Sequence, residues 1–171
     1  MLFNNLIPRR FNSSFIQALK ITPPSTYSLA FTKPAVNRLS ALATTGDALR
    51  IKVSSGGCHG YQYDLELVKL DEQLQKLKSG AEGMIFFELP FEKPTEEELQ
   101  SVLAAQPSAK ITPLNTQNKG DPQVLVSIDD LSLELLDKTT LDFHKQLIGS
   151  QFKIVGGNMK SSCGCGSSFD I

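Results

Sequence analysis

The sequence predicts a single domain that is mainly β with a few short α-helices, and that closes into a compact mixed β-sandwich or a barrel-like sheet. Short runs with apolar residues at every second position recur along the 171 residues, as half-buried strands require. Glycine and proline clusters separate these runs, as expected between short strands. Few segments have helical spacing, and no internal repeat is present. Strands this short usually close into a small sandwich or barrel.

The beginning of the chain has the composition of a targeting segment. The first 46 residues contain no Asp or Glu and are rich in Ser and Thr. Arg9 and Arg10 stand beside apolar residues at helical spacing, such as Phe11 and Phe15. This basic, hydroxyl-rich, amphipathic pattern is typical of a mitochondrial transit peptide. We expect a transit peptide and linker over residues 1–30, and hence a matrix protein; the alternative is a disordered tail that carries no address.

Charge and hydropathy exclude two classes of partner. The residues after position 46 carry 12 basic and 18 acidic side chains, a net charge of −6. Nucleic-acid binding needs a concentrated basic face, so we expect no nucleic acid. No apolar run reaches the roughly 18–20 residues that a membrane-spanning helix requires, so we expect no membrane insertion.

The first half of the domain, from residue 31 on, predicts a helix and a hairpin. Thr32 is placed to cap a helix that has Pro34 in its first turn and ends at Gly46. Alternating apolar residues predict strands over 49–53 and 61–67. The glycine-rich stretch "SSGGCHG" lies between these strands and holds Cys58 in or next to the hairpin loop.

Residues 71–122 are expected to be an insertion or an elaborated crossover. The runs "DEQLQKLKSG" and "TEEELQSVLAAQ" have helical spacing, and Thr95 with Glu98 forms a capping box. The run "GMIFFELPF" between them predicts a short strand.

The second half predicts strands around one helix. "QVLVSI" and "LSLELL" are expected to be strands on either side of a turn at residues 129–130. "TTLDFHKQLIG" is expected to be a helix with Thr139 and Asp142 at capping-box spacing, and its His144 to lie at the surface. "SQFKIV" predicts one more strand.

The three cysteines form the candidate site. Cys58, Cys163 and Cys165 all stand among glycines, in "SSGGCHG" and "KSSCGCGSSFDI". A reducing matrix disfavours disulfides, and thiolates select zinc, copper(I) or iron–sulfur clusters. A cluster typically takes four cysteines, so three leave a gap that a second copy can fill. Such an incompletely filled site suits transfer better than storage.

Two alternatives remain open from the residues alone. The first is a structural zinc module that uses Cys58, His59, Cys163 and Cys165, although the usual paired knuckle is absent. The second is a thiol oxidoreductase that uses Cys163 and Cys165 as a redox pair, although no thioredoxin-like C-x-x-C motif is present.

Four blocks of the sequence resemble, in order, those of the A-type iron–sulfur carriers, the IscA/HesB family: "SGGCHGYQYDLEL", "VLVSIDDLSLELLDKTTLDF", "LIGSQFKI" and "KSSCGCGSSFDI". The resemblance covers roughly residues 34–70 and 123–171. Cys58, Cys163 and Cys165 fall on the three family ligands. His59 stands where many members have Ser, and "VGGNMK" replaces an Asn-Pro-Asn-like stretch. Both departures resemble the second fungal mitochondrial A-type paralogue.

The resemblance implies a HesB-type domain over residues 31–171 and a non-enzymatic function in cluster assembly. It implies binding of iron or of a [2Fe–2S] or [4Fe–4S] cluster, usually across a dimer. The clients implied are [4Fe–4S] enzymes of the aconitase and radical-SAM types, including lipoate and biotin synthases. The partners implied are the other A-type paralogue or a second copy, a folate-binding-like assembly factor and a monothiol glutaredoxin donor.

Overall fold

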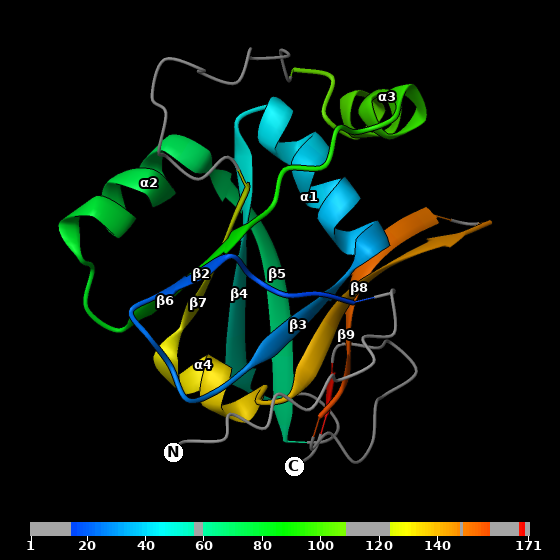
Figure 1. Cartoon of the computed structure of the whole chain (residues 1–171). Coiled ribbons are helices and arrows are strands. Elements are labelled where there is room, and N and C mark those ends of the chain that lie inside the picture. Colours follow the sequence, from blue (N-terminus) through cyan, green and yellow to red (C-terminus); the bar gives the residue numbers. More distant parts are fainter. Residues whose placement is uncertain (1–14, 57–59, 109–123, 148, 158–167, 170–171) are drawn as a thin grey trace, which may run out of the picture.

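Two mixed sheets and four helices make up the part of the chain that the structure, a computed structural model, describes: residues 15–56, 60–108, 124–147, 149–157 and 168–169 (Figure 1). The strands are β1 Phe15–Ile16, β2 Lys20–Thr22, β3 Leu29–Thr32, β4 Asp47–Ser55, β5 Tyr61–Lys69, β6 Met84–Leu89, β7 Val124–Asp129, β8 Thr139–Gln146, β9 Gly149–Gly156 and β10 Ser168–Phe169. The helices are α1 Lys33–Thr44, α2 Leu70–Ser79, α3 Glu96–Ala105 and α4 Asp130–Leu135. The predicted predominance of strands is confirmed.

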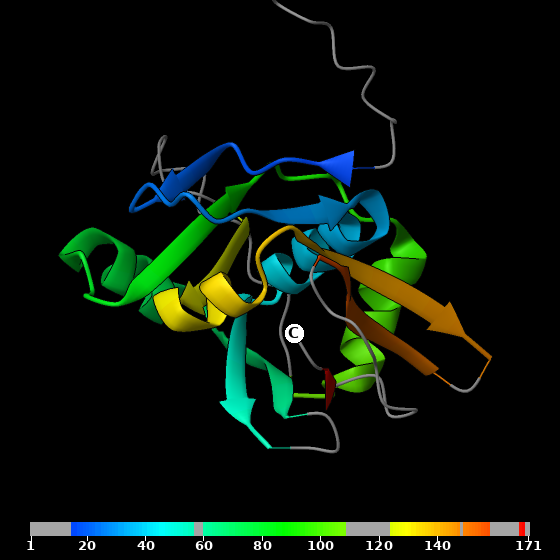
Figure 2. The ribbon, with the colours of Figure 1, turned by 90° about the horizontal axis from the view of Figure 1, so that it is seen from below.

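The larger sheet has the order β10-β5-β4-β7-β6-β2, and the smaller has the order β1-β3-β8-β9. The β8–β9 hairpin extends away from the rest of the molecule (Figure 2). No helix in the described part of the chain is long and apolar enough to cross a membrane.

Helix α1 forms where the sequence predicts it and fills the core. The Thr32 side chain accepts a hydrogen bond from the Ala35 amide, and Pro34 lies in the first turn. Val36, Leu39 and the other apolar residues of its inner face are buried. Burial of each large aliphatic side chain contributes about 1.5–3 kcal/mol, which holds the helix against strands of both sheets.

The predicted hairpin is confirmed as β4 and β5, which pair antiparallel from Asp47 with Lys69 to Ser55 with Tyr61. The other edge of β4 pairs parallel with β7. The hairpin is therefore anchored in the middle of the larger sheet rather than standing alone.

The described part of residues 71–122 contains the predicted helices and strand. The capping box of Thr95 and Glu98 is present at the start of α3. Strand β6 lies between β7 and β2, and its Phe86 and Phe87 are buried. This segment therefore contributes an internal strand and part of the core.

The strand predicted over residues 131–136 is wrong, because this segment forms α4. The carboxylate of Asp129 accepts hydrogen bonds from the Ser132 amide at 2.9 Å and from the Ser132 hydroxyl at 2.6 Å, which caps the helix. Leu133 and Leu136, three residues apart, are buried, whereas Leu131 is 73% exposed. The alternating leucines suggested a strand, but the buried ones are spaced as in a helix.

The helix predicted over residues 139–149 is also wrong, because Thr139–Gln146 is β8. Thr139, Leu141 and Phe143 are buried, which is the every-second-residue pattern of a strand. Asp142 does not cap a helix here: its Oδ1 accepts a hydrogen bond from the Thr32 hydroxyl at 2.6 Å. His144 lies on the strand, is partly exposed, and has its Nε2 2.9 Å from Asp142 Oδ2.

The N-terminal strands belong to both sheets. β1 pairs with β3, β3 pairs parallel with β8, and β2 forms the far edge beside β6. Leu29 and Phe31 are buried. The expected boundary near residue 30 thus falls inside β3.

Candidate metal centre

The predicted ligands Cys58, Cys163 and Cys165 lie outside the described residues, as does His59. The geometry of the site is therefore given by the chain on either side of them. Each cysteine stretch is attached to a strand of the larger sheet, Cys58 through β4 and β5 and the C-terminal pair through β10.

A backbone hydrogen bond closes the hairpin loop that carries Cys58. The amide of Gly56 donates to the carbonyl of Gly60 at 2.9 Å. Cys58 is the middle one of the three residues that connect these glycines. Gly60 has a φ of +95°, which glycine adopts without the penalty that a side chain would add. The loop is short, and its ends are fixed.

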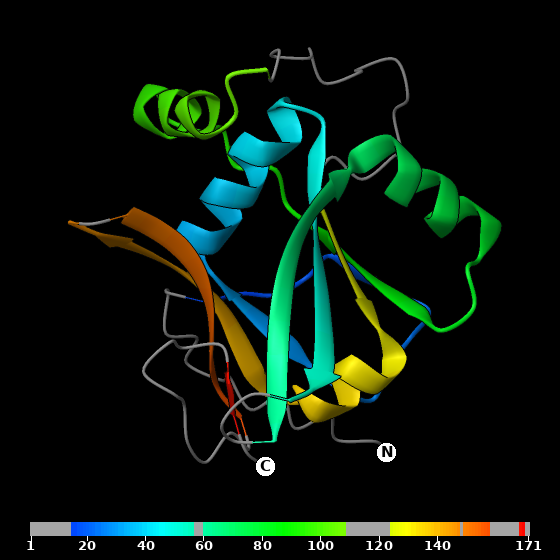
Figure 3. The same ribbon diagram turned by 180° about the vertical axis from the view of Figure 1, so that it is seen from behind.

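The end of the chain returns to the same place. Strand β10 pairs antiparallel with β5, with Phe169 opposite Tyr61 and Ser168 opposite Gln62. Figure 3 shows the end of the chain near the lower end of β5. Cys58 precedes Tyr61 by three residues, and Cys165 precedes Ser168 by three. Three extended residues span at most about 11 Å. The stretch that holds Cys58 and the stretch that holds Cys165 are more than a hundred residues apart in the sequence. Each is joined, within three residues, to a strand, and these two strands pair with each other.

Tyr63 connects the two strands that lead to the cysteines. Its side chain is buried, and its hydroxyl oxygen accepts a hydrogen bond from the Ile154 amide at 3.3 Å. Ile154 belongs to β9, the strand that precedes the C-terminal cysteines. The alternation of apolar residues in the sequence predicts the strand but does not reveal this link between sheets.

Gly157 directly follows the end of β9, where the backbone conformation and the neighbouring atoms leave no room for a side chain. It has a φ of +67°, and a Cβ there would lie 2.5 Å from Thr139 Cγ2 and 2.7 Å from the Asp137 carbonyl oxygen. No side chain fits without movement of the neighbouring backbone. The glycine pair in "VGGNMK" was the available signal, but composition alone does not identify the atoms that exclude a side chain.

Helix α4 supports strand β4 near the hairpin loop. The Val53 amide donates to the Ser132 hydroxyl oxygen at 2.9 Å, and that hydroxyl donates to Asp129. Ser132 is itself buried. The block "SIDDLS" therefore both caps α4 and supports the strand that leads to Cys58.

Thiolates are donors for soft metals and for iron–sulfur clusters. Thiolate ligands exchange one at a time when another thiolate attacks, and an incompletely filled site makes that exchange easier.

Comparisons with known proteins agree with this chemistry. The chain is 38% identical over 145 residues to iron-sulfur assembly protein 2 of Saccharomyces cerevisiae, over 84% of this chain and 68% of that protein. It is 30% identical over 161 residues to the iron-sulfur cluster insertion protein ErpA of Coxiella burnetii, over 90% of this chain and 98% of that protein. It is 32% identical over 136 residues to the iron-binding protein IscA of Klebsiella pneumoniae, over 80% of this chain and 89% of that protein. No family model matches the chain.

A solved structure shares the fold. Escherichia coli SufA, involved in biosynthesis of iron–sulfur clusters, matches with a TM-score of 0.50 at 18% identity, over 86% of this chain and 99% of that one. A crystal structure of IscA with a [2Fe–2S] cluster matches with a TM-score of 0.44 at 25% identity, over 84% of this chain and 97% of that one.

These relatives are assembly, insertion and iron-binding proteins rather than enzymes, which removes the reason to consider a thiol oxidoreductase. Their identity extends across almost the full length of the bacterial proteins. The chain therefore belongs to the A-type iron–sulfur carriers, the family that includes IscA and ErpA.

Proposed function

We propose that this protein is a mitochondrial carrier that binds iron, or a [2Fe–2S] or [4Fe–4S] cluster, through Cys58, Cys163 and Cys165. The observation that supports the proposal is the pairing of β10 with β5, which brings Ser168, three residues after Cys165, opposite Gln62 of the hairpin that bears Cys58. Family membership supports the iron chemistry, because relatives are named for iron binding and for cluster insertion.

Incomplete ligation is the proposed basis of transfer. Three thiolates leave one position of a typical four-thiolate cluster unfilled, so a second chain completes the set. The second chain is either another copy or the other A-type paralogue. An incoming client thiolate then replaces the carrier's thiolates in turn.

The proposed clients are apo-enzymes of the [4Fe–4S] class, of the aconitase and radical-SAM types that include lipoate and biotin synthases. The proposed donor is a monothiol glutaredoxin, and a folate-binding-like assembly factor acts with the carrier. The acid-free, Arg-bearing first residues and the similarity to the yeast protein support a location in the mitochondrial matrix.

Anaerobic reconstitution with iron and sulfide tests the proposal. The full chain should turn brown and absorb visible light, and each single variant Cys58→Ser, Cys163→Ser and Cys165→Ser should lose most of that absorption. His59→Ala should keep it, because imidazole is not among the proposed ligands.

The contrary result is a protein that stays colourless, binds zinc, and needs both His59 and the three cysteines to do so. That outcome would establish the structural zinc module instead. Unfolding of the protein by a chelator would support the same conclusion, because structural zinc sites contribute directly to folding.

A further inference from the structure

Strand β5 has an outer edge that β10 covers only at its beginning. The amide of Gly56 bonds to Gly60, and the amide of Leu70 bonds to Gly46. Because the backbone groups of successive residues in an antiparallel strand point to alternate sides, the even-numbered residues of β5 face β4. The odd-numbered residues therefore face outward. Among the described residues, no strand pairs with the outward backbone groups of Leu65 or Leu67.

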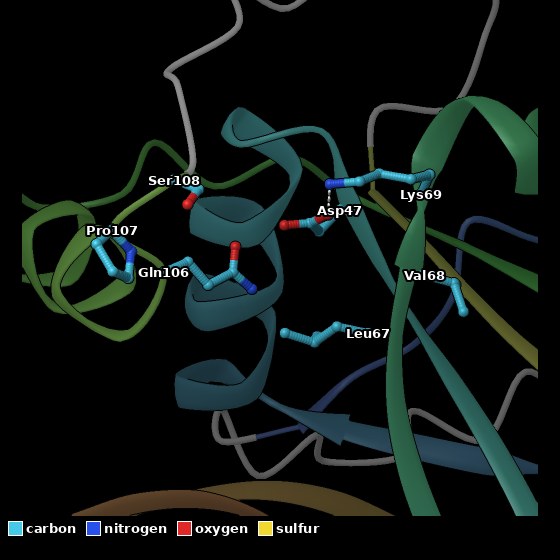
Figure 4. A pocket seen from close by; sticks show the side chains of 7 residues that line it. All are labelled: Asp47, Leu67, Val68, Lys69, Gln106, Pro107 and Ser108. Atoms are coloured by element: carbon cyan, nitrogen blue, oxygen red, sulfur yellow. Dashed lines mark hydrogen bonds and ion pairs between the residues drawn. The ribbon is translucent and has the colours of Figure 1, made fainter.

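The same end of β5 borders a cavity of about 440 Å³. One wall is formed by Leu67, Val68 and Lys69 and the other by Gln106–Ser108 at the end of α3. Figure 4 shows Leu67 projecting from β5 toward α1 and Gln106, while Val68 points to the other side of the strand. The Leu67 side chain is 47% exposed, although Tyr63 on the same face is buried. The inner face of the sheet is thus uncovered at this end.

Polar side chains that contact one another form one end of the cavity. Asp47 is buried, its Oδ1 lies 2.7 Å from Lys69 Nζ, and its Oδ2 accepts a hydrogen bond from the Thr45 hydroxyl at 3.2 Å. Asp47 and Lys69 thus line the polar end of the cavity, and Leu67 offers an apolar surface beside them. An apolar side chain inserted here would pack on Leu67 and on Pro107.

The opposite face of β5 carries two carboxylates at the same level. Asp64 and Glu66 point there, and β4 places Lys52 and Arg50 opposite them. A strand added to the outer edge of β5 would also place its residues opposite Asp64 and Glu66. Basic residues are favoured at those positions, because opposite charges across strands stabilise pairing by about 0.2–1 kcal/mol and like charges destabilise it.

We propose that the edge of β5 at Leu65 and Leu67 binds an extended segment of a partner protein by strand addition. The segment alternates apolar residues, which enter the cavity beside Leu67, with basic residues, which face Asp64 and Glu66. Strand addition to an exposed edge is an established mode of peptide recognition. Strand β10 already pairs with the beginning of this edge. The bound segment would therefore extend the same line of backbone hydrogen bonds along β5.

This surface is separate from the cysteine centre. Leu67 stands six residues along β5 from Tyr61, about 20 Å at the usual rise per residue. The proposal therefore does not require the metal chemistry, and it assigns to the carrier a docking surface for a donor or client at the far end of the hairpin.

A labelled synthetic peptide of alternating valine and lysine is the probe, titrated onto the full-length protein by fluorescence anisotropy. We expect Leu67→Lys to weaken binding at least tenfold. Leu131→Lys, at a 73% exposed position on α4, should leave binding unchanged. A peptide of the same composition in scrambled order and one of alternating valine and glutamate should both bind more weakly.

Hydrogen exchange gives the second readout. The amides of Leu65 and Leu67 should exchange fast in the free protein and slowly with the peptide. Equal affinity for Leu67→Lys, with an unchanged urea midpoint, overturns the proposal. Slow exchange of the Leu65 and Leu67 amides before the peptide is added also overturns it. Sedimentation, which measures the oligomeric state, then tells whether a second copy or the chain itself covers the edge. Cluster reconstitution on Leu67→Lys should match that of the unmodified protein, so failure here leaves the carrier function untouched.

Discussion

Among the described positive-φ glycines, Gly157 is the one at which an added Cβ would overlap neighbouring atoms. Gly157→Ala should reduce the free energy of unfolding by about 2–4 kcal/mol, because backbone strain at positive φ adds to steric overlap. Gly83 is the matched control, since it has a similar φ of +73° and nothing within 4 Å of an added Cβ. Gly83→Ala should cost only the strain, about 1 kcal/mol. Urea denaturation measures both, and equal losses would contradict the overlap.

Asp142 joins the start of α1 to β8. Partial burial raises its pKa, but hydrogen bonds from the Thr32 hydroxyl and the Phe143 amide, and the neighbouring His144, outweigh that effect and lower the pKa below 3.8. A carboxylate with a lowered folded pKa stabilises the protein above the unfolded pKa, and this contribution disappears as pH falls through the folded value.

The stability advantage of the unmodified protein over Asp142→Asn should therefore be larger at pH 5 than at pH 3. It should shrink below about pH 4, the unfolded value. Urea midpoints measured across this range check the prediction. A difference that stays unchanged down to the lowest accessible pH would show that the charge of Asp142 contributes nothing.

At the scale of elements, the sequence was most informative where local signals agree. Thr32 with Pro34 predicted α1, Thr95 with Glu98 predicted α3, and strict alternation predicted the β4–β5 hairpin. Two assignments failed where patterns compete. Alternating leucines over 131–136 outweighed the Asp129 cap, and the spacing of Thr139 and Asp142 resembled a capping box although it lies in a strand.

Strand β10 is the element that tethers the C-terminal cysteines. A chain that ends at Gly166 lacks β10, so its reconstituted cluster should be lost to a chelator several times faster. The rest of the fold should persist, because only two residues of pairing are removed. A chain that ends at Phe169 keeps β10 and is the control. Equal rates of loss in the two truncated chains would show that β10 does not hold the tail.

For the whole molecule, the site could be predicted only as a set of residue types. The cysteines and their glycines were visible in the sequence, and so was their soft-metal chemistry. The link from Tyr63 to Ile154, the return of β10 to β5 and the open edge at Leu67 were not visible. Each depends on strands that lie far apart in the chain, and no local pattern encodes their pairing.

The arrangement of the first strands predicts where a presequence can end. β1, β2 and β3 belong to the sheets, and Phe31 is fully buried. Cleavage near residue 30 would remove β1 and β2, so we propose cleavage before Phe15. The intact mass of the protein purified from mitochondria locates the new N-terminus. A terminus between residues 23 and 32 would contradict this proposal.

Convergence of the sulfur atoms is tested most directly with dibromobimane, which fluoresces only when it joins two nearby thiols. The Cys163→Ser variant without metal offers the reagent Cys58 and Cys165. We expect strong fluorescence and one crosslink per thiol pair, assigned by intact mass to one chain or to two. Two separate adducts without a crosslink, in the monomer and in any dimer alike, would contradict a shared centre.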